Sequence, residues 1–116
     1  MALPALSPSG VRFAQGGAGL LWFEATAIVP EGRANPRQLW LHEGNWQAFR
    51  ALRERALEAG RMANGADHHP FTTIQLTHSG RYSRPMGRPA PILAHHDGLL
   101  DAAQGLPADY PLIGDE

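Results

Sequence analysis

The residues best equipped for chemistry lie in one short stretch, TTIQLTHSGRYSRP, which spans residues 72–85. The stretch opens like a β-strand, since it begins with β-branched residues, and it carries Gln75 in the middle of that run. It then breaks into the polar turn HSGR at residues 78–81. A carboxamide offers one acceptor and two donors side by side. A glutamine in a buried strand that ends in hydrogen-bonding side chains therefore either pairs with a neighbouring backbone or binds a ligand.

Other residues with chemical potential form weaker patterns. Four of the six histidines occur as the adjacent pairs His68-His69 and His95-His96, whose rings point to opposite faces of an extended chain. No His-x-x-x-His spacing and no cysteine accompany them, so we expect no metal site. The glycines that precede the first apolar run form neither a dinucleotide fingerprint nor a Walker loop.

Composition limits the class of protein. At 116 residues the chain is at most one domain of modest size, and 43% hydrophobic with 18% charged residues is typical of a globular protein. A net charge of −1 argues against a dedicated nucleic-acid or anionic-membrane surface. The longest apolar run, residues 18–23, is too short to span a bilayer, and the first ten residues lack the pattern of a signal peptide. The absence of cysteine fits a reducing compartment, and we expect a cytoplasmic protein.

The first third of the chain predicts one strand between irregular segments. Residues 1–10 are rich in proline, serine and glycine and are expected to form a loose leader. Residues 11–15 have the pattern of a helix end that the following glycines stop. The apolar run and Glu24 predict a strand over residues 18–24, covered on both faces. Residues 28–38 contain two prolines and a glycine and are expected to form a loop.

The middle of the chain predicts the clearest helix and a second strand. Asn45 is a good N-cap, apolar residues follow at helical spacing, and Gly60 is expected to end the helix. Residues 71–77 predict the second strand. From residue 78 to residue 111 repeated prolines predict neither helix nor strand. Strand, helix and strand in this order form a βαβ unit with parallel strands, which needs further elements to cover both faces of its sheet.

Two segments together carry a resemblance to a known family. GGAGLLWFEATAIVPEGRANPRQLWL, followed by QLTHSGRYSRP, resembles the second and third strand segments of the NADH:flavin oxidoreductases of the old yellow enzyme family, including the 2,4-dienoyl-CoA reductase branch. The resemblance covers residues 16–88 and weakens in residues 89–116, which we expect to be an extended proline-rich loop. It implies an α/β fold that is part of a (β/α)8 TIM barrel. A complete barrel takes about 250 residues, so residues 1–116 would be a fragment from its early portion.

The resemblance also implies a cofactor and two residues that bind it. In the family the glutamine of the Q-L-x-H-x-G-R motif meets the pyrimidine edge of FMN, which carries over to Gln75. The small residue after the strand glutamate packs close to the flavin, which carries over to Ala25. The implied activity of the full-length enzyme is transfer of hydride from NAD(P)H, through the flavin, to an activated alkene. No catalytic residue falls within this chain, and an iron–sulfur cluster would belong to a later segment.

Three more residues near the expected barrel mouth are interpreted as structural. Either His78 or Arg81 could touch the substrate or the cofactor at that mouth, but both are expected first to brace the loop, with Arg81 pairing with Glu24 or with backbone carbonyl groups. Arg33 is expected to clamp its own turn. Tyr82 could donate a proton in principle, but the family's proton donor comes from a later segment.

Two other classes of function stay open at the level of sequence. One is a stand-alone small α/β domain that binds a ligand or partner without redox chemistry. The other is a module for single-stranded nucleic acid that uses the basic and aromatic residues between Arg81 and Arg88. For the flavin-enzyme fragment we expect a chain that is inactive alone, poorly soluble or a homo-oligomer, and without bound flavin.

Overall fold

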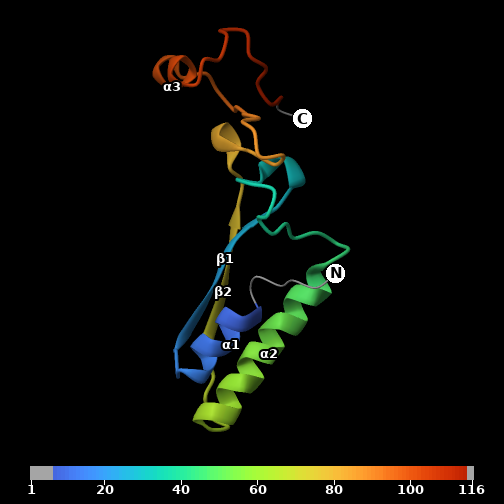
Figure 1. Ribbon diagram of the computed structural model, residues 1–116, viewed down its shortest axis with the longest axis vertical. Coiled ribbons are helices and arrows are strands. Elements are labelled where there is room, and N and C mark those ends of the chain that lie inside the picture. Colours follow the sequence, from blue (N-terminus) through green and yellow to red (C-terminus); the bar gives the residue numbers. More distant parts are fainter. Residues whose placement is uncertain (1–6, 115–116) are drawn as a thin grey trace.

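The structure, a computed structural model, describes residues 7–114 and shows an elongated molecule of 59 × 28 × 26 Å (Figure 1). Its helices and strands in chain order are α1 (Ser7–Gln15), β1 (Leu20–Ala27), α2 (Trp46–Asn64), β2 (Phe71–Thr77) and α3 (Gly98–Ala103). Short 3-10 turns occupy Pro30–Gly32 and Gly80–Tyr82. Within the described residues this is a small α/β fold with three α-helices and one two-stranded sheet.

The two strands pair in parallel, as the sequence predicts. Leu20 faces Phe71 at the start of the ladder, and Phe23 faces Ile74. The register then shifts by one residue, because the next pair is Thr26 with Leu76. β1 therefore contains a bulge, and it continues to Ala27 instead of ending at the predicted residue 24.

Helix α2 confirms the predicted helix but ends later than predicted. Asn45 occupies the N-cap position, although its side chain makes no cap hydrogen bond and donates instead to the Trp40 carbonyl group at 2.7 Å. The predicted stop at Gly60 is wrong. The helix runs to Asn64 and ends at Gly65, whose φ of 106° is readily adopted only by glycine.

Gly60 has a packing role in the interior of α2. A Cβ atom there would lie 3.3 Å from the Ala14 Cβ and 3.0 Å from the His68 Cδ2. The missing side chain lets α1 approach α2 closely, and Ala14 and Ala56 form a buried cluster with Leu21 of β1. The Asn64 side chain strengthens the same contact by donating to the Ala14 carbonyl oxygen at 2.9 Å.

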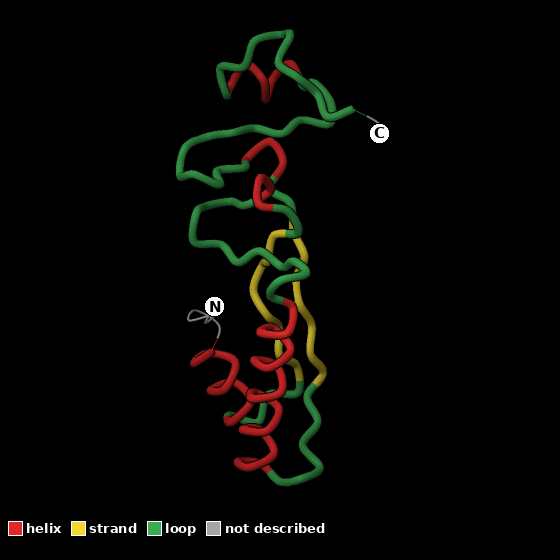
Figure 2. Tube along the Cα trace, turned by 90° about the vertical axis from the view of Figure 1, so that its right-hand side faces the viewer, coloured by secondary structure: helices red, strands yellow, loops and turns green. Residues whose placement is uncertain are grey.

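The helices α1 and α2 cover only one face of the sheet (Figure 2). Leu21 is 2% exposed beneath them, and Phe23 packs against the same helices. On the other face Trp22 is 60% exposed, because side chains alternate along a strand and nothing in the described residues covers it. The expectation of a strand covered on both faces is therefore met on one face only. The structure shows a small α/β fold, and its being part of a TIM barrel stays a prediction.

Two expectations about irregular segments are wrong. Residues 7–10 of the expected leader belong to α1, while residues 1–6 lie outside the described part. The region after β2 was expected to contain no helix, but it contains α3. This C-terminal arm, residues 78–114, extends along the long axis beyond the C-terminal ends of the strands (Figure 1). Asp97 caps α3 by accepting from the backbone N–H groups of Leu99 and Leu100.

Candidate functional site

The two residues predicted to bind a cofactor lie side by side near the C-terminal ends of the parallel strands. The bulge sits between the pairs Phe23–Ile74 and Thr26–Leu76, so Ala25 falls within the stretch of β1 that faces Gln75. Parallel strands deliver the residues at their C-terminal ends to one edge of a sheet, which is where α/β proteins commonly bind ligands.

The Gln75 side chain points away from the helices. Its neighbour Ile74 faces α2, and alternation along β2 turns Gln75 to the uncovered face. There the Trp22 Nε1–H donates to the Gln75 Oε1 at 3.2 Å. The carboxamide is exposed, so its remaining hydrogen-bonding capacity is available to a ligand.

Ala25 is half-buried and its backbone is held by a residue that the sequence analysis missed. The Gln38 Nε2 donates to the Ala25 carbonyl oxygen at 3.1 Å and to the Thr77 Oγ1 at 3.2 Å. Its Oε1 accepts from the Ala34 backbone N–H at 2.6 Å. Gln38 thus joins the ends of both strands to the loop that follows β1. A lone glutamine in a proline-containing loop gives no sequence signal for this role.

The interpretation of His78 and Arg33 as loop braces agrees with their contacts. The His78 Nδ1 accepts from the Gly80 backbone N–H at 2.9 Å. Its ring lies so close to the preceding loop that a Cβ atom on Gly32 would be 2.8 Å from the His78 Cδ2. The Arg33 Nε donates to the Pro30 carbonyl oxygen at 3.1 Å.

Arg81 also braces the molecule, and of its two expected kinds of partner, Glu24 and a backbone carbonyl group, the carbonyl group is found. The Arg81 side chain is 11% exposed and its guanidinium forms an ion pair with Asp101 of α3. It also donates to the Gln104 Oε1 and the His95 carbonyl oxygen, each at 3.2 Å, the carbonyl contact being of the expected kind. In return the Gln104 Nε2 donates to the Arg81 carbonyl oxygen at 3.1 Å. Together, the contacts of Arg81 with Asp101, Gln104 and His95 form a lock that attaches α3 to the turn after β2.

Asp101 is the electrostatic centre of this lock. It is 8% exposed, and its second carboxylate oxygen lies 2.7 Å from the His96 Nδ1. The hydrogen bond from Arg81, helped by the one with His96, holds the pKa of Asp101 below its usual value of 3.8. The carboxylate is therefore the favoured form in the folded protein, and it neutralises a guanidinium that is itself largely removed from water.

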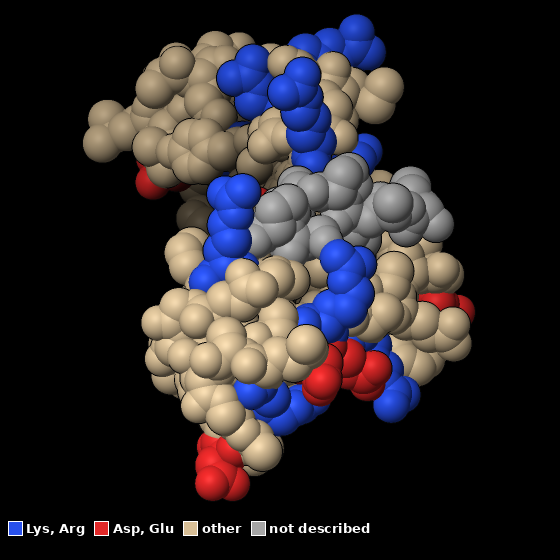
Figure 3. Space-filling view, turned by 60° about the horizontal axis from the view of Figure 1, so that its bottom comes forward, with Lys and Arg blue, Asp and Glu red and all other residues tan. Residues whose placement is uncertain are grey.

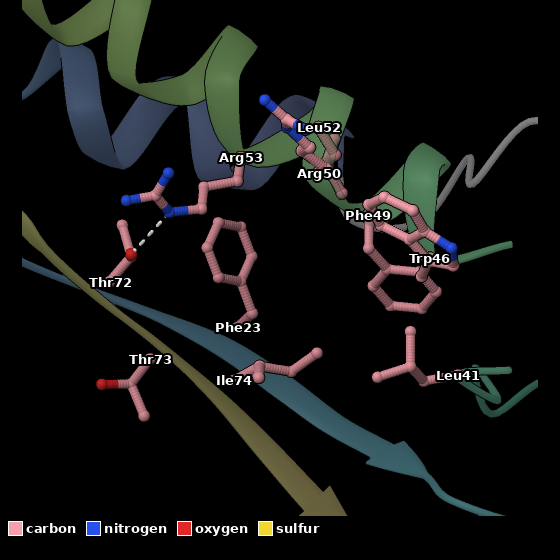
Figure 4. A pocket seen from close by; sticks show the side chains of 10 residues that line it. All are labelled: Phe23, Leu41, Trp46, Phe49, Arg50, Leu52, Arg53, Thr72, Thr73 and Ile74. Atoms are coloured by element: carbon pink, nitrogen blue, oxygen red, sulfur yellow. Dashed lines mark hydrogen bonds between the residues drawn. The ribbon is translucent and has the colours of Figure 1, made fainter. Parts of the chain in front are cut away.

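An apolar groove opens on the helix side of β2 (Figure 4). Its volume is about 360 Å³, and Phe23 and Ile74 of the strands face Phe49 and Leu52 of α2 across it. At its rim the Arg53 Nε donates to the Thr72 Oγ1 at 2.8 Å. This groove lies on the opposite face of the sheet from Gln75, so it is separate from the candidate site.

All ten basic residues are arginines, and on the face drawn in Figure 3 they are spread out instead of gathered in one patch. Within residues 7–114 no three side chains among His, Cys, Asp and Glu come together as potential metal ligands. None of the helices in that range has the length and apolar character that a membrane span requires.

Comparison with known proteins adds no family: the chain matches no protein-family model, and no curated protein matches it significantly.

Proposed function

We propose that this chain is an early portion of the barrel of an FMN-dependent oxidoreductase of the old yellow enzyme type. The observation that carries the proposal is the shared location of Gln75 and Ala25 at one end of two parallel strands. The Gln75 carboxamide lies on the face away from the helices, which corresponds to the interior of a barrel. We expect the complete enzyme to be cytoplasmic and to act on a small-molecule substrate.

The residues present suit the pyrimidine edge of a flavin. That edge carries a carbonyl group beside an N–H group, and a carboxamide can meet both at once. Among the described residues the Gln75 Oε1 accepts one hydrogen bond, from Trp22, and a carbonyl oxygen has two lone pairs. Within residues 7–114 the Gln75 Nε2 donates no hydrogen bond, so this amino group is free to donate to a ligand carbonyl. Ala25 adds little bulk beside it.

Bound FMN would supply transfer of hydride from NAD(P)H to an activated alkene, and this chain would supply part of its binding site. Gln75 would orient the ring and, by hydrogen bonding, help set its electron affinity. Gln38 would hold the backbone at Ala25 so that the ring can approach it closely. No described residue is assigned a proton-transfer role.

The decisive experiment uses the polypeptide encoded by the whole reading frame that contains this chain. After purification the protein should be yellow and retain FMN through gel filtration. Replacing Gln75→Met removes the amide at nearly constant size and should weaken FMN binding about 2- to 12-fold per lost hydrogen bond. The matched control is Gln47→Met, an exposed glutamine on α2, the helix that covers the opposite face of the sheet, and it should leave FMN affinity unchanged.

Two results would contradict the proposal. One is a full-length protein that binds no flavin, and the other is equal FMN affinity in the two glutamine variants. The 116-residue chain by itself should be colourless and should not oxidise NAD(P)H. We also expect it to self-associate, because its exposed apolar side chains and unpaired strand edges favour contact with another copy.

A further inference from the structure

The uncovered face of the sheet carries a second residue that acts on the candidate site. Trp22 is 60% exposed there, and its indole Nε1–H donates to the Gln75 Oε1 at 3.2 Å. The two side chains come from different strands and are 53 positions apart in sequence. The contact therefore depends on the parallel pairing of β1 with β2.

The chemistry of the indole fixes which end of the carboxamide it meets. An indole N–H is only a donor, whereas a carboxamide has an acceptor end and a donor end. A hydrogen bond from Trp22 is therefore possible only to the oxygen of Gln75. The Nε2 group must then point away from Trp22, and the amide cannot flip without losing the bond.

The backbone makes this contact a stable one. Trp22 faces Thr73 in the ladder, before the bulge. Its neighbour Leu21 is buried against α1 and α2, which prevents the strand from turning Trp22 toward the helices. The indole is thus held on the same face as Gln75 although no described element packs over it.

We propose that Trp22 is a positioning residue, which orients the Gln75 carboxamide to read a planar ring edge with a carbonyl beside an N–H group. The free Nε2 donates to the ligand carbonyl, and the second lone pair of Oε1 accepts from the ligand N–H. This inference rests on the proposed function where the ligand is FMN. It adds a residue whose effect on the ligand passes through Gln75.

The first test follows the hydrogen bond itself and needs no ligand. The ultraviolet resonance Raman signal of indole reports N–H hydrogen bonding, and the difference between the wild-type chain and Trp22→Phe isolates Trp22 from the other two tryptophans. Gln75→Met should shift this signal toward a weaker hydrogen bond, and Gln47→Met should not. An unchanged Trp22 signal in Gln75→Met overturns the positioning role.

The second test uses the flavin-binding, full-length polypeptide with FMN and with FMN methylated at N3, which lacks the N–H of the edge. Wild-type protein should prefer FMN about 2- to 12-fold, the expected contribution of one hydrogen bond. Trp22→Phe keeps an aromatic ring but should lose most of this preference. The control Trp46→Phe, at a 46% exposed tryptophan on the helix side, should keep it.

The outcomes separate the two proposals. Full preference for FMN in Trp22→Phe overturns the positioning role while leaving flavin binding intact. Failure of wild-type protein to bind either flavin overturns the proposed function, and the Raman result then decides the role of Trp22 independently.

Discussion

The α/β unit, residues 7–77, and the attachment of α3 in the C-terminal arm depend on different forces. In the α/β unit, Leu21, Ala14 and Ala56 are at most 2% exposed and form a cluster that joins both helices to β1. In the arm, α3 is attached through the ion pair of Arg81 with Asp101 and the hydrogen bonds of Gln104. Apolar burial is insensitive to pH, whereas a charged lock is not. The two regions should therefore fail under different perturbations.

The largest effect is expected from a cavity in the α/β unit. Leu21→Ala removes a fully buried side chain and should lower the free energy of unfolding by about 2–5 kcal/mol. Its neighbour Leu20 is 50% exposed, so Leu20→Ala is a matched control with a much smaller effect. Urea unfolding followed by far-ultraviolet circular dichroism measures both. Equal losses would show that the cluster is not the main support of this unit.

A smaller and local effect is expected from breaking the lock in the arm. Asp101→Asn removes the charge that Arg81 and His96 share and should free α3 while the sheet stays folded. Amide hydrogen exchange in α3 and at Leu106, whose N–H donates to the Asp101 carbonyl oxygen, should accelerate about tenfold. Asp109→Asn changes an exposed carboxylate in the same arm and should have no such effect.

Acid should reproduce the same separation without a mutation. Because the folded pKa of Asp101 lies below 3.8, its ionised form stabilises the arm at higher pH, and this contribution is lost as pH falls through 3.8 toward the folded pKa. Amide exchange measured from about pH 5 to about pH 2 should show α3 opening before β1 and β2. Simultaneous opening would mean that the arm and the sheet unfold as one unit.

The smallest effect is expected from a surface ion pair. The Arg50 Nε lies 2.9 Å from the Glu54 Oε1, but their side chains are 66% and 55% exposed. Arg50→Ala should therefore cost less than about 0.5 kcal/mol. Arg53→Ala on the same helix should cost more, since it also loses the hydrogen bond to Thr72 of β2. Urea unfolding ranks the two variants. The reverse order would contradict the claim that the Arg53–Thr72 hydrogen bond stabilises the fold more than the Arg50–Glu54 ion pair does.

Local pattern was enough to predict the parts of the fold that depend on burial. The apolar spacing after Asn45 predicted α2, and the β-branched run before Thr77 predicted β2 with parallel pairing. The end of α2 was mispredicted because glycine serves two purposes. Gly65 stops the helix through its positive φ, whereas Gly60 makes room for Ala14, and only the position of α1 distinguishes them.

The arm was mispredicted because its contacts are distant in sequence and polar. Helix α3 has six residues, too short to form without outside support. That support comes from Asp97 at its start and from Arg81, which lies 20 positions before its partner Asp101. At the candidate site, Gln75 and Ala25 were predicted from the resemblance, but Trp22 and Gln38 were not. Their hydrogen bonds exist only once both strands and the intervening loop are in place.

The bulge in β1 makes the length of this segment as important as its composition. Before the bulge, Leu21 and Phe23 meet the helices; after it, Thr26 and Ala27 are both fully buried, and Ala27 exchanges backbone hydrogen bonds with Leu39 and Leu41. One residue advances a strand by about 3.3 Å and turns its side chain to the other face. Deleting one residue between Phe23 and Thr26 would remove the bulge from the pairing of β1 with β2. It would also shift each later residue of β1 by one position relative to the helices and to the loop after the strand. Substitutions between Phe23 and Thr26 can therefore be accommodated, but an insertion or a deletion there would require the loop after β1 to change its conformation.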